Sequence, residues 1–211
     1  MSDLGLRTAT GLVLIALALL ASVQGGTIFA LFVAAIATGL YYEWARLVKG
    51  WGLAWNAAGF VYALVPAVAL LWIRERDFDH GLALVVWVFI VTWATDIGAY
   101  FAGRKFGRRK LAATISPNKT VEGLYGGIVG AALFGGLWAW ATGLGTTLYL
   151  LAPLLAVAAQ GGDLFESAMK RRAGVKDSGN WLPGHGGLLD RLDGLIPVAV
   201  LTAAVQTLGL T

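Results

Sequence analysis

Four long runs without a charged residue constrain this chain more than any other feature of its sequence. They cover residues 8–42, 50–73, 123–162 and 194–211. One helical crossing of a bilayer needs about 20 mainly apolar residues, so the runs of 35 and 40 residues are each long enough for two short crossings. Because 58% of the residues are hydrophobic and only 13% are charged, we predict an integral membrane protein rather than a soluble domain.

Glycine breaks and charged residues divide the apolar runs into about seven transmembrane helices. The expected crossings are residues 8–23, 27–42, 53–73, 82–101, 123–142, 147–161 and 194–210. The first of them also has the length of a signal peptide, but its charged region is weak and further apolar segments follow at once, so we take it as a span. The prediction is an all-α polytopic membrane protein that forms a single integral membrane domain over residues 1–211.

The distribution of basic residues predicts how the chain is oriented. If the N-terminus is cytoplasmic, 14 of the 16 Lys and Arg residues fall on the cytoplasmic side, and only Arg74 and Arg76 fall outside. Loops rich in Lys and Arg stay on the cytoplasmic side of a membrane. This topology places the charged connections 103–122 and 163–193 on one face, where they can form one polar site.

The stretch of residues 160–193 holds ten of the 28 charged residues of the chain. A helix that continues from the sixth crossing would place Asp163, Ser167, Lys170 and Arg171 on one face. A carboxylate, a hydroxyl and two cations in a row suit a metal ion with a polyphosphate lying along it. The carboxylates Asp163, Asp190 and Asp193 could supply the oxygen ligands that Mg²⁺ prefers. In the intervening Gly-rich turn, His185 could hydrogen-bond the backbone or a phosphate.

Two further polar features lie earlier in the chain. Asp96 falls late in an apolar span, where a carboxylate is costly and by default a functional candidate, although it could instead orient helices. The connection 103–122 carries six basic residues, which could simply hold the loop inside and contact anionic lipid headgroups. Its polar turn at residues 116–120 precedes Glu122 and a Gly-rich helix, and hydroxyls, an amide and a lysine at a helix start form a candidate phosphate cradle.

Several other chemistries are not supported. The chain has no cysteine, which excludes disulfides and thiolate metal sites. His185 and Asp190 have the H-x-x-x-x-D spacing of glycerolipid acyltransferases, but this pattern is short and does not account for Asp163, Ser167 or Lys170. The Walker motif and the D-G-x-x-A-R pattern of CDP-alcohol phosphatidyltransferases are both missing.

At residues 167–193 the sequence resembles the phosphatidate cytidylyltransferase family, also called CDP-diacylglycerol synthases. The family's pattern is S-x-(apolar)-K-R-x₄-K-D-x-(small)-x₂-(apolar)-(P/G)-x-H-G-G-(apolar)-x-D-R-(apolar)-D, and these residues match it throughout. Asp96 with Tyr100, and ISPNKTVEG at residues 115–123, resemble two further family segments. The likeness covers the C-terminal half, whereas the N-terminal spans match only in being hydrophobic. Many bacterial members are longer, by about one or two N-terminal helices.

The resemblance implies condensation of CTP with phosphatidic acid to give CDP-diacylglycerol and pyrophosphate. It also implies roles for three groups of residues. Those expected at the reacting phosphates are Ser167, Lys170, Arg171, Asp177 and His185. Those expected to bind substrate, or to order the basic groups that do, are Asp96, Ser116, Asn118, Lys119, Thr120, Glu122 and Arg191. The expected metal ligands are Asp163, Asp190 and Asp193.

The expected cofactor is Mg²⁺, with a second cation left open. The expected partners are CTP, phosphatidic acid and membrane lipid, but no nucleic acid, and a homodimer is left open. The expected location is the inner membrane, with the site facing the cytoplasm. Two rivals also remain open: a transporter or channel that uses Asp96 as part of a polar pathway, and a CTP-dependent transferase or kinase acting on another lipid, such as a polyprenol or an ether lipid.

Overall fold

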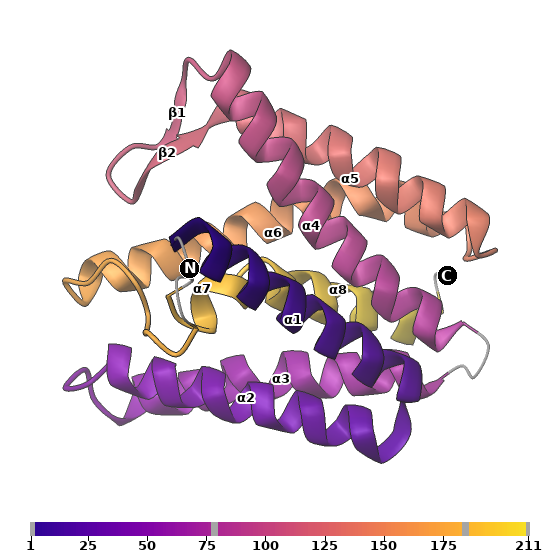
Figure 1. Cartoon of the computed structure of the whole chain (residues 1–211), viewed down its shortest axis with the longest axis horizontal. Coiled ribbons are helices and arrows are strands. Elements are labelled where there is room, and N and C mark those ends of the chain that lie inside the picture. The colour runs from indigo at the N-terminus through magenta and orange to yellow at the C-terminus, as the bar shows by residue number, and fades with distance from the viewer. Residues whose placement is uncertain (1–2, 77–79, 183–185, 210–211) are drawn as a thin grey trace.

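The computed structural model describes residues 3–76, 80–182 and 186–209, which form helices and one small β-hairpin (Figure 1). The elements in chain order are α1 (Asp3–Gln24), α2 (Gly26–Leu47), α3 (Leu53–Arg76), α4 (Gly81–Phe106), β1 (Lys110–Ala112), β2 (Ser116–Thr120), α5 (Val121–Ala141), α6 (Thr147–Arg172), α7 (Leu189–Leu192) and α8 (Leu195–Thr207).

A helix occupies each of the seven predicted crossings. Five of the helices described, α2 to α6, are long and apolar enough to cross a membrane. The apolar part of α1 and the whole of α8 are shorter. Gly25 and Gly26, predicted as a break, adopt positive φ angles of 63° and 50° between α1 and α2. The chain is therefore a multi-pass helical membrane protein.

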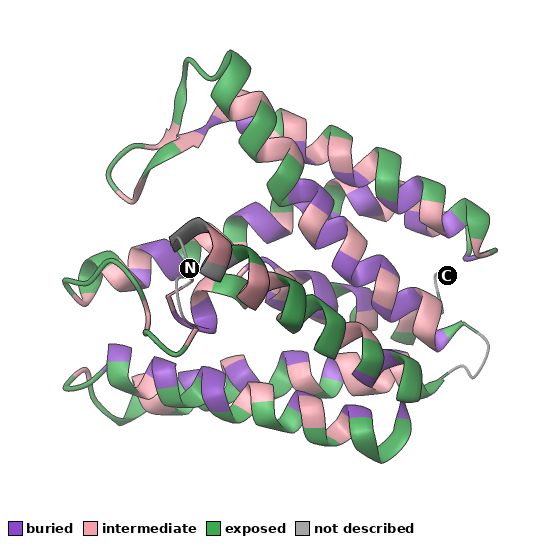
Figure 2. Ribbon diagram, viewed as in Figure 1, coloured by how far each residue is buried: buried purple, intermediate pink, exposed green. Residues whose placement is uncertain are grey.

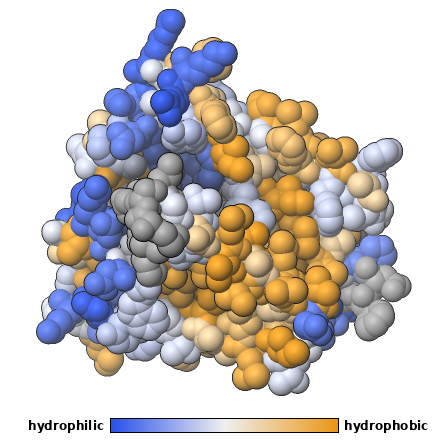
Figure 3. Space-filling model, in the orientation of Figure 1, coloured by the Kyte–Doolittle hydropathy of each residue, from blue (hydrophilic) through white to orange (hydrophobic). Residues whose placement is uncertain are grey.

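Large apolar side chains cover the outer surface of the bundle. Buried residues line the inward faces of the helices in Figure 2, and hydrophobic residues spread over the middle of the face seen in Figure 3. Leu133 and Trp140 on α5 and Leu150 on α6 are 64%, 72% and 74% exposed. Such a surface suits the hydrocarbon of a bilayer, because lipid tails are as apolar as these side chains.

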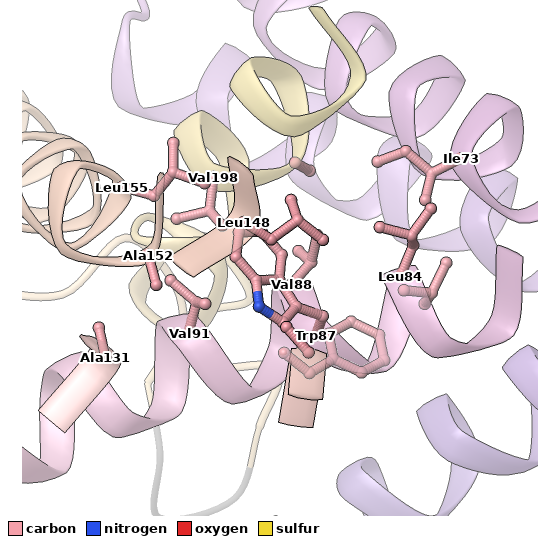
Figure 4. Close-up of a cluster of buried hydrophobic side chains, with 14 of the residues drawn as sticks. Ile73, Leu84, Trp87, Val88, Val91, Ala131, Leu148, Ala152, Leu155 and Val198 are labelled. Atoms are coloured by element: carbon pink, nitrogen blue, oxygen red, sulfur yellow. The ribbon is translucent and has the colours of Figure 1, made fainter. Parts of the chain in front are cut away.

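The main core surrounds Trp87 of α4, which is fully buried (Figure 4). Its indole N–H donates to the Gly135 carbonyl of α5 at 3.0 Å, so the one polar atom of this side chain is satisfied. Val91, Leu148 and Val198 pack around the ring from α4, α6 and α8. The core thus holds together the helices that carry the polar residues discussed below.

Glycines allow α4 and α5 to pack closely, as small residues commonly do between membrane helices. A side chain at Gly98 would collide with the Gly126 carbonyl, and a Cβ on Gly130 would lie 2.6 Å from the Ala94 carbonyl. The absence of side chains at these glycines is therefore what lets the two helices approach closely.

The β-hairpin is a departure from the all-α prediction. β1 and β2 pair antiparallel, with Lys110 opposite Thr120 and Ala112 opposite Ser116. The hairpin lies at the end of the bundle that also contains α7 and the C-terminal end of α6 (Figure 1). At the other end, Arg74 donates to the Ser22 carbonyl at 2.7 Å and Arg76 donates to the Gln206 carbonyl. The polar connections therefore gather at one end, as their charge pattern predicts.

Candidate active site

Lys119 of β2 and Asp163 of α6 join the two charged connections. The Lys119 Nζ atom lies 2.6 Å from Asp163 Oδ2 and donates to Gln160 Oε1 at 2.7 Å. One helical turn further along α6, the Ser167 hydroxyl donates to Asp163 Oδ1 at 3.3 Å. The prediction that α6 continues past its crossing and places Asp163 and Ser167 on one face is confirmed.

Two further carboxylates lie near this pair. Asp193, between α7 and α8, is partly buried, and its Oδ1 accepts from the Gly194 N–H at 2.8 Å. Burial raises the pKa of Asp193 to about 7, and the negative charges of Asp163 and Asp96 act in the same direction. Asp96 itself is exposed on α4 and interacts electrostatically with Lys119. Three carboxylates and one ammonium group thus share one site.

The carboxylates do not form a complete metal-binding shell. Within residues 3–76, 80–182 and 186–209, no three Asp, Glu or His side chains lie close enough together to hold one ion. Mg²⁺ is commonly held by one or two protein carboxylates, with substrate phosphates and waters supplying its other ligands. Asp163 and Asp193 fit that requirement, because their charges repel in a partly buried place and a divalent cation would relieve the repulsion. The metal site remains a prediction.

Asp190, the other expected ligand, belongs to a separate ion-pair group. Lys170 Nζ lies 2.5 Å from Glu166 Oε2 and 2.5 Å from Asp190 Oδ1. The second oxygen of Asp190 accepts from the Gly187 N–H at 2.8 Å and from the Ser178 N–H at 3.0 Å. Burial would raise the pKa of Asp190, but the hydrogen bonds from Lys170 and Gly187 hold it below its ordinary value. Lys170 therefore ties the end of α6 to α7.

Glu43 of α2 holds the loop that leads into α7. This carboxylate is 1% exposed, and it accepts from the Leu188 N–H at 2.9 Å and from the Leu189 N–H at 2.8 Å. The Ser178 hydroxyl lies 3.1 Å from Glu43 Oε2. A side chain at Gly187 would collide with Ser178 and Glu43, so the glycine permits this close approach.

Replacing Glu43 by glutamine should destabilise the protein by about 1–3 kcal/mol, because the new amide group would face a backbone N–H donor that loses its acceptor. Thermal unfolding in detergent measures the effect. The matched control is Glu75→Gln, since Glu75 is exposed and accepts one N–H, from Gly26 at 2.9 Å. Equal unfolding temperatures for the two variants would show that the carboxylate of Glu43 does not hold the loop.

The hairpin is fixed to the bundle by its own polar contacts. Thr120 caps α5 by accepting the Gly123 N–H at 3.0 Å. Glu122 accepts the N–H groups of Arg108 and Arg109 at 3.0 and 3.2 Å, so it orders the basic connection, which was one of its two predicted roles. The other role, in binding substrate, remains a prediction.

The remaining predicted residues have different surroundings. Arg171 donates to the Ile115 carbonyl of the hairpin at 3.2 Å rather than lying beside Lys170. Arg191 on α7 is exposed and interacts electrostatically with Asp96. The other positions differ in exposure: Ser116 is partly buried, and Asn118 and Asp177 are exposed. His185 lies outside the described residues.

Sequence reasoning assigned no role to Glu43, Gln160, Glu166 or Ser178. For Glu43 a signal was present, because it falls at helical spacing with the apolar residues Leu40, Trp44 and Leu47, all of which are buried. Glu166 likewise stands four residues before Lys170, the spacing of an ion pair on a helix. Ser178 has no such local signal, because its partners come from other elements.

Comparison with known proteins gives one consistent family. The sequence model of the Cytidylyltransferase family matches residues 51–208. The phosphatidate cytidylyltransferase of Brucella suis is 37% identical over 252 aligned positions, which cover 95% of this chain and 92% of that protein. Proteins of the same name from Pseudomonas aeruginosa and Bacillus subtilis are 38% and 48% identical. These alignments cover 81% and 59% of this chain, and 64% and 48% of those proteins. The chain therefore belongs to the cytidylyltransferase family.

Proposed function

We propose that this chain transfers the cytidylyl group of CTP to phosphatidate, giving CDP-diacylglycerol and pyrophosphate. The family membership and the names of the curated relatives support this activity. The observation that links this activity to particular residues is the contact between Lys119 of the hairpin and Asp163 of α6. Both residues lie in the region that the family model matches, and they meet at one end of a membrane bundle.

The reaction needs little covalent chemistry from the protein. A phosphate oxygen of phosphatidate attacks the α-phosphorus of CTP, the bond to the oxygen that bridges the α and β phosphorus atoms breaks, and that oxygen leaves with pyrophosphate. Both reactants are polyanions, so the main task is to bring them together and to stabilise the charge on the leaving group. Lys119 would hold a phosphate, while Asp163, Gln160 and Ser167, which contact Lys119 or one another, would orient its ammonium group or the ligand beside it.

In this proposal Asp163 and Asp193 would hold Mg²⁺ at the phosphates. When bound, the ion would neutralise phosphate charge and so lower the cost of placing two anions side by side. To become a third metal ligand, Asp190 would have to give up its ion pair with Lys170. Lys170 would then serve mainly to hold α7 in place, and Arg171 to hold the hairpin. Arg171 would also add positive charge near the site.

We further propose that seven helices cross the inner membrane and that the site faces the cytoplasm. The gathering of polar residues at one end of the bundle, with Arg74 and Arg76 at the other, supports this orientation. CTP would then reach the site directly from the cytoplasm, and the lipid substrate would come from the surrounding bilayer.

Purified protein in detergent should incorporate labelled CTP into lipid when phosphatidate and Mg²⁺ are present, and EDTA should abolish the incorporation. Thin-layer separation of the labelled lipid, together with release of pyrophosphate, measures the reaction. A polyprenyl phosphate and an ether-linked phosphatidate, each added in competition, test the rival lipid substrates. Ion or solute flux in proteoliposomes without any labelled lipid would instead favour the transporter.

A further inference from the structure

A large apolar cavity lies between the N-terminal helices and the polar site. Its volume is about 270 Å³, it is partly open to the surroundings, and it is bounded by α1, α2, α3, α4, α7 and α8. Protein interiors contain few voids larger than a water molecule, and an engineered apolar cavity of about 150 Å³ is already large enough to bind benzene. A space of this size in a natural bundle therefore suggests a ligand.

The lining of the cavity restricts the chemistry of that ligand. Its walls are apolar apart from Thr92, Arg191 and the indole N–H of Trp93. The Thr92 hydroxyl donates to the Val88 carbonyl at 2.9 Å within its own helix, so it has no hydrogen to offer a ligand. The walls consequently suit a hydrocarbon, because a polar molecule would lose its hydrogen bonds with water and find no replacement.

Arg191 connects the cavity to the polar site. It lies on α7 between Asp190 and Asp193, lines the cavity and interacts electrostatically with Asp96. An amphipathic anion would place its charged group beside Arg191 and its apolar part among the helices. No comparable charge lines the rest of the cavity within the described part of the chain.

The opposite part of the cavity extends toward the far end of the bundle. Gly11, Leu14, Ile15 and Ala18 of α1 line it and share one helical face. Ala18 lies one turn before Ser22, whose carbonyl accepts the hydrogen bond from Arg74. Ile15 lines the cavity and is 39% exposed, so the cavity is not fully enclosed at α1.

We propose that this cavity binds one acyl chain of phosphatidate, with Arg191 at the phosphate end and Ala18 near the far end of the chain. The inference rests on the proposed function and adds to it a binding site for the lipid tail. One acyl chain thus leaves the bilayer when the lipid binds. This geometry aligns the phosphate of the lipid with Asp96, Lys119 and Asp163 before CTP reacts.

Ala18→Phe tests the proposal, with Ala16→Phe as its control, because Ala16 is exposed on the same helix and does not line the cavity. A phenylalanine at position 18 should raise the KM for dioleoyl phosphatidate in mixed micelles at least about tenfold, since it fills the space needed by the chain. The KM for CTP and the rate with soluble dihexanoyl phosphatidate should change by less than about twofold, as should every constant of Ala16→Phe. Equal effects of the two variants on the long-chain lipid would overturn the proposal.

A binding experiment separates failure of this proposal from failure of the proposed function. Phosphatidate with a photoreactive diazirine at the end of its acyl chain should label residues of the cavity wall, and peptide mapping locates them. Ala18→Phe should lose this labelling and Ala16→Phe should keep it. Labelling confined to the outer face of α5 would overturn the acyl site. Absence of cytidylyl transfer by the unmodified protein would instead refute the proposed function.

Discussion

Replacing Asp163 by asparagine should lower kcat/KM by about a hundredfold or more, the size of effect seen when one charge-stabilising group is removed from an active site. Asp163 contacts Lys119 at 2.6 Å and accepts from Ser167, and it shares the site with Asp193. Asparagine preserves its size but removes the negative charge that would position the lysine and attract a cation. Initial rates of labelled CTP incorporation measure the loss.

The fold of the Asp163→Asn variant should be unchanged, because the side chain is 30% exposed and Lys119 keeps its contact with Gln160. The unfolding temperature in detergent checks this point, and Glu75→Gln, at the other end of the bundle, serves as an activity control. Metal affinity, measured by titration calorimetry, should fall together with activity. Full activity in Asp163→Asn would refute both its proposed role as a metal ligand and its role in positioning Lys119.

Replacing Lys170 by methionine should destabilise the protein by about 3–5 kcal/mol, because removal of one partner leaves buried charges without compensation. The side chains of Glu166 and Asp190 are only 2% and 8% exposed, and Lys170 lies between them. Methionine would fill much of the same space while supplying no charge. Thermal unfolding in detergent measures the change.

Two variants make the Lys170 result specific. Lys49→Met removes an exposed lysine and should leave the unfolding temperature nearly unchanged. The double change Glu166→Gln with Lys170→Met removes one of the two uncompensated carboxylates and should recover part of the lost stability. A Lys170→Met protein as stable as Lys49→Met would mean that the ion pairs at α6 and α7 contribute nothing to stability.

Much of the helical framework could be predicted, because apolar runs of membrane length leave few alternatives to helices. The run from residue 147 even predicts α6 correctly beyond its crossing, since the spacing of Asp163 and Ser167 is helical. The hairpin was not predicted. Its strands are short and the pairing of Lys110 with Thr120 depends on a partner ten residues away, which gives no local periodicity to detect.

The polar site was predicted in composition more accurately than in arrangement. Helical spacing brings Asp163 and Ser167 together, but it cannot show that Lys170 turns toward Glu166 and Asp190. That choice depends on where α7 packs, which is a tertiary contact. The same limit explains why Lys119, on β2, was assigned to a phosphate cradle without its partner Gln160, which lies on α6.

The contact of Glu43 with the start of α7 has a consequence for modular exchange among relatives. The region that matches the family begins at residue 51, yet the N–H groups of Leu188 and Leu189 find their acceptor in a residue before that boundary. The C-terminal motif is therefore not self-contained. A chimera that takes its first two helices from another protein should therefore form the loop before α7 correctly only if the donor has an acidic side chain at the position of Glu43.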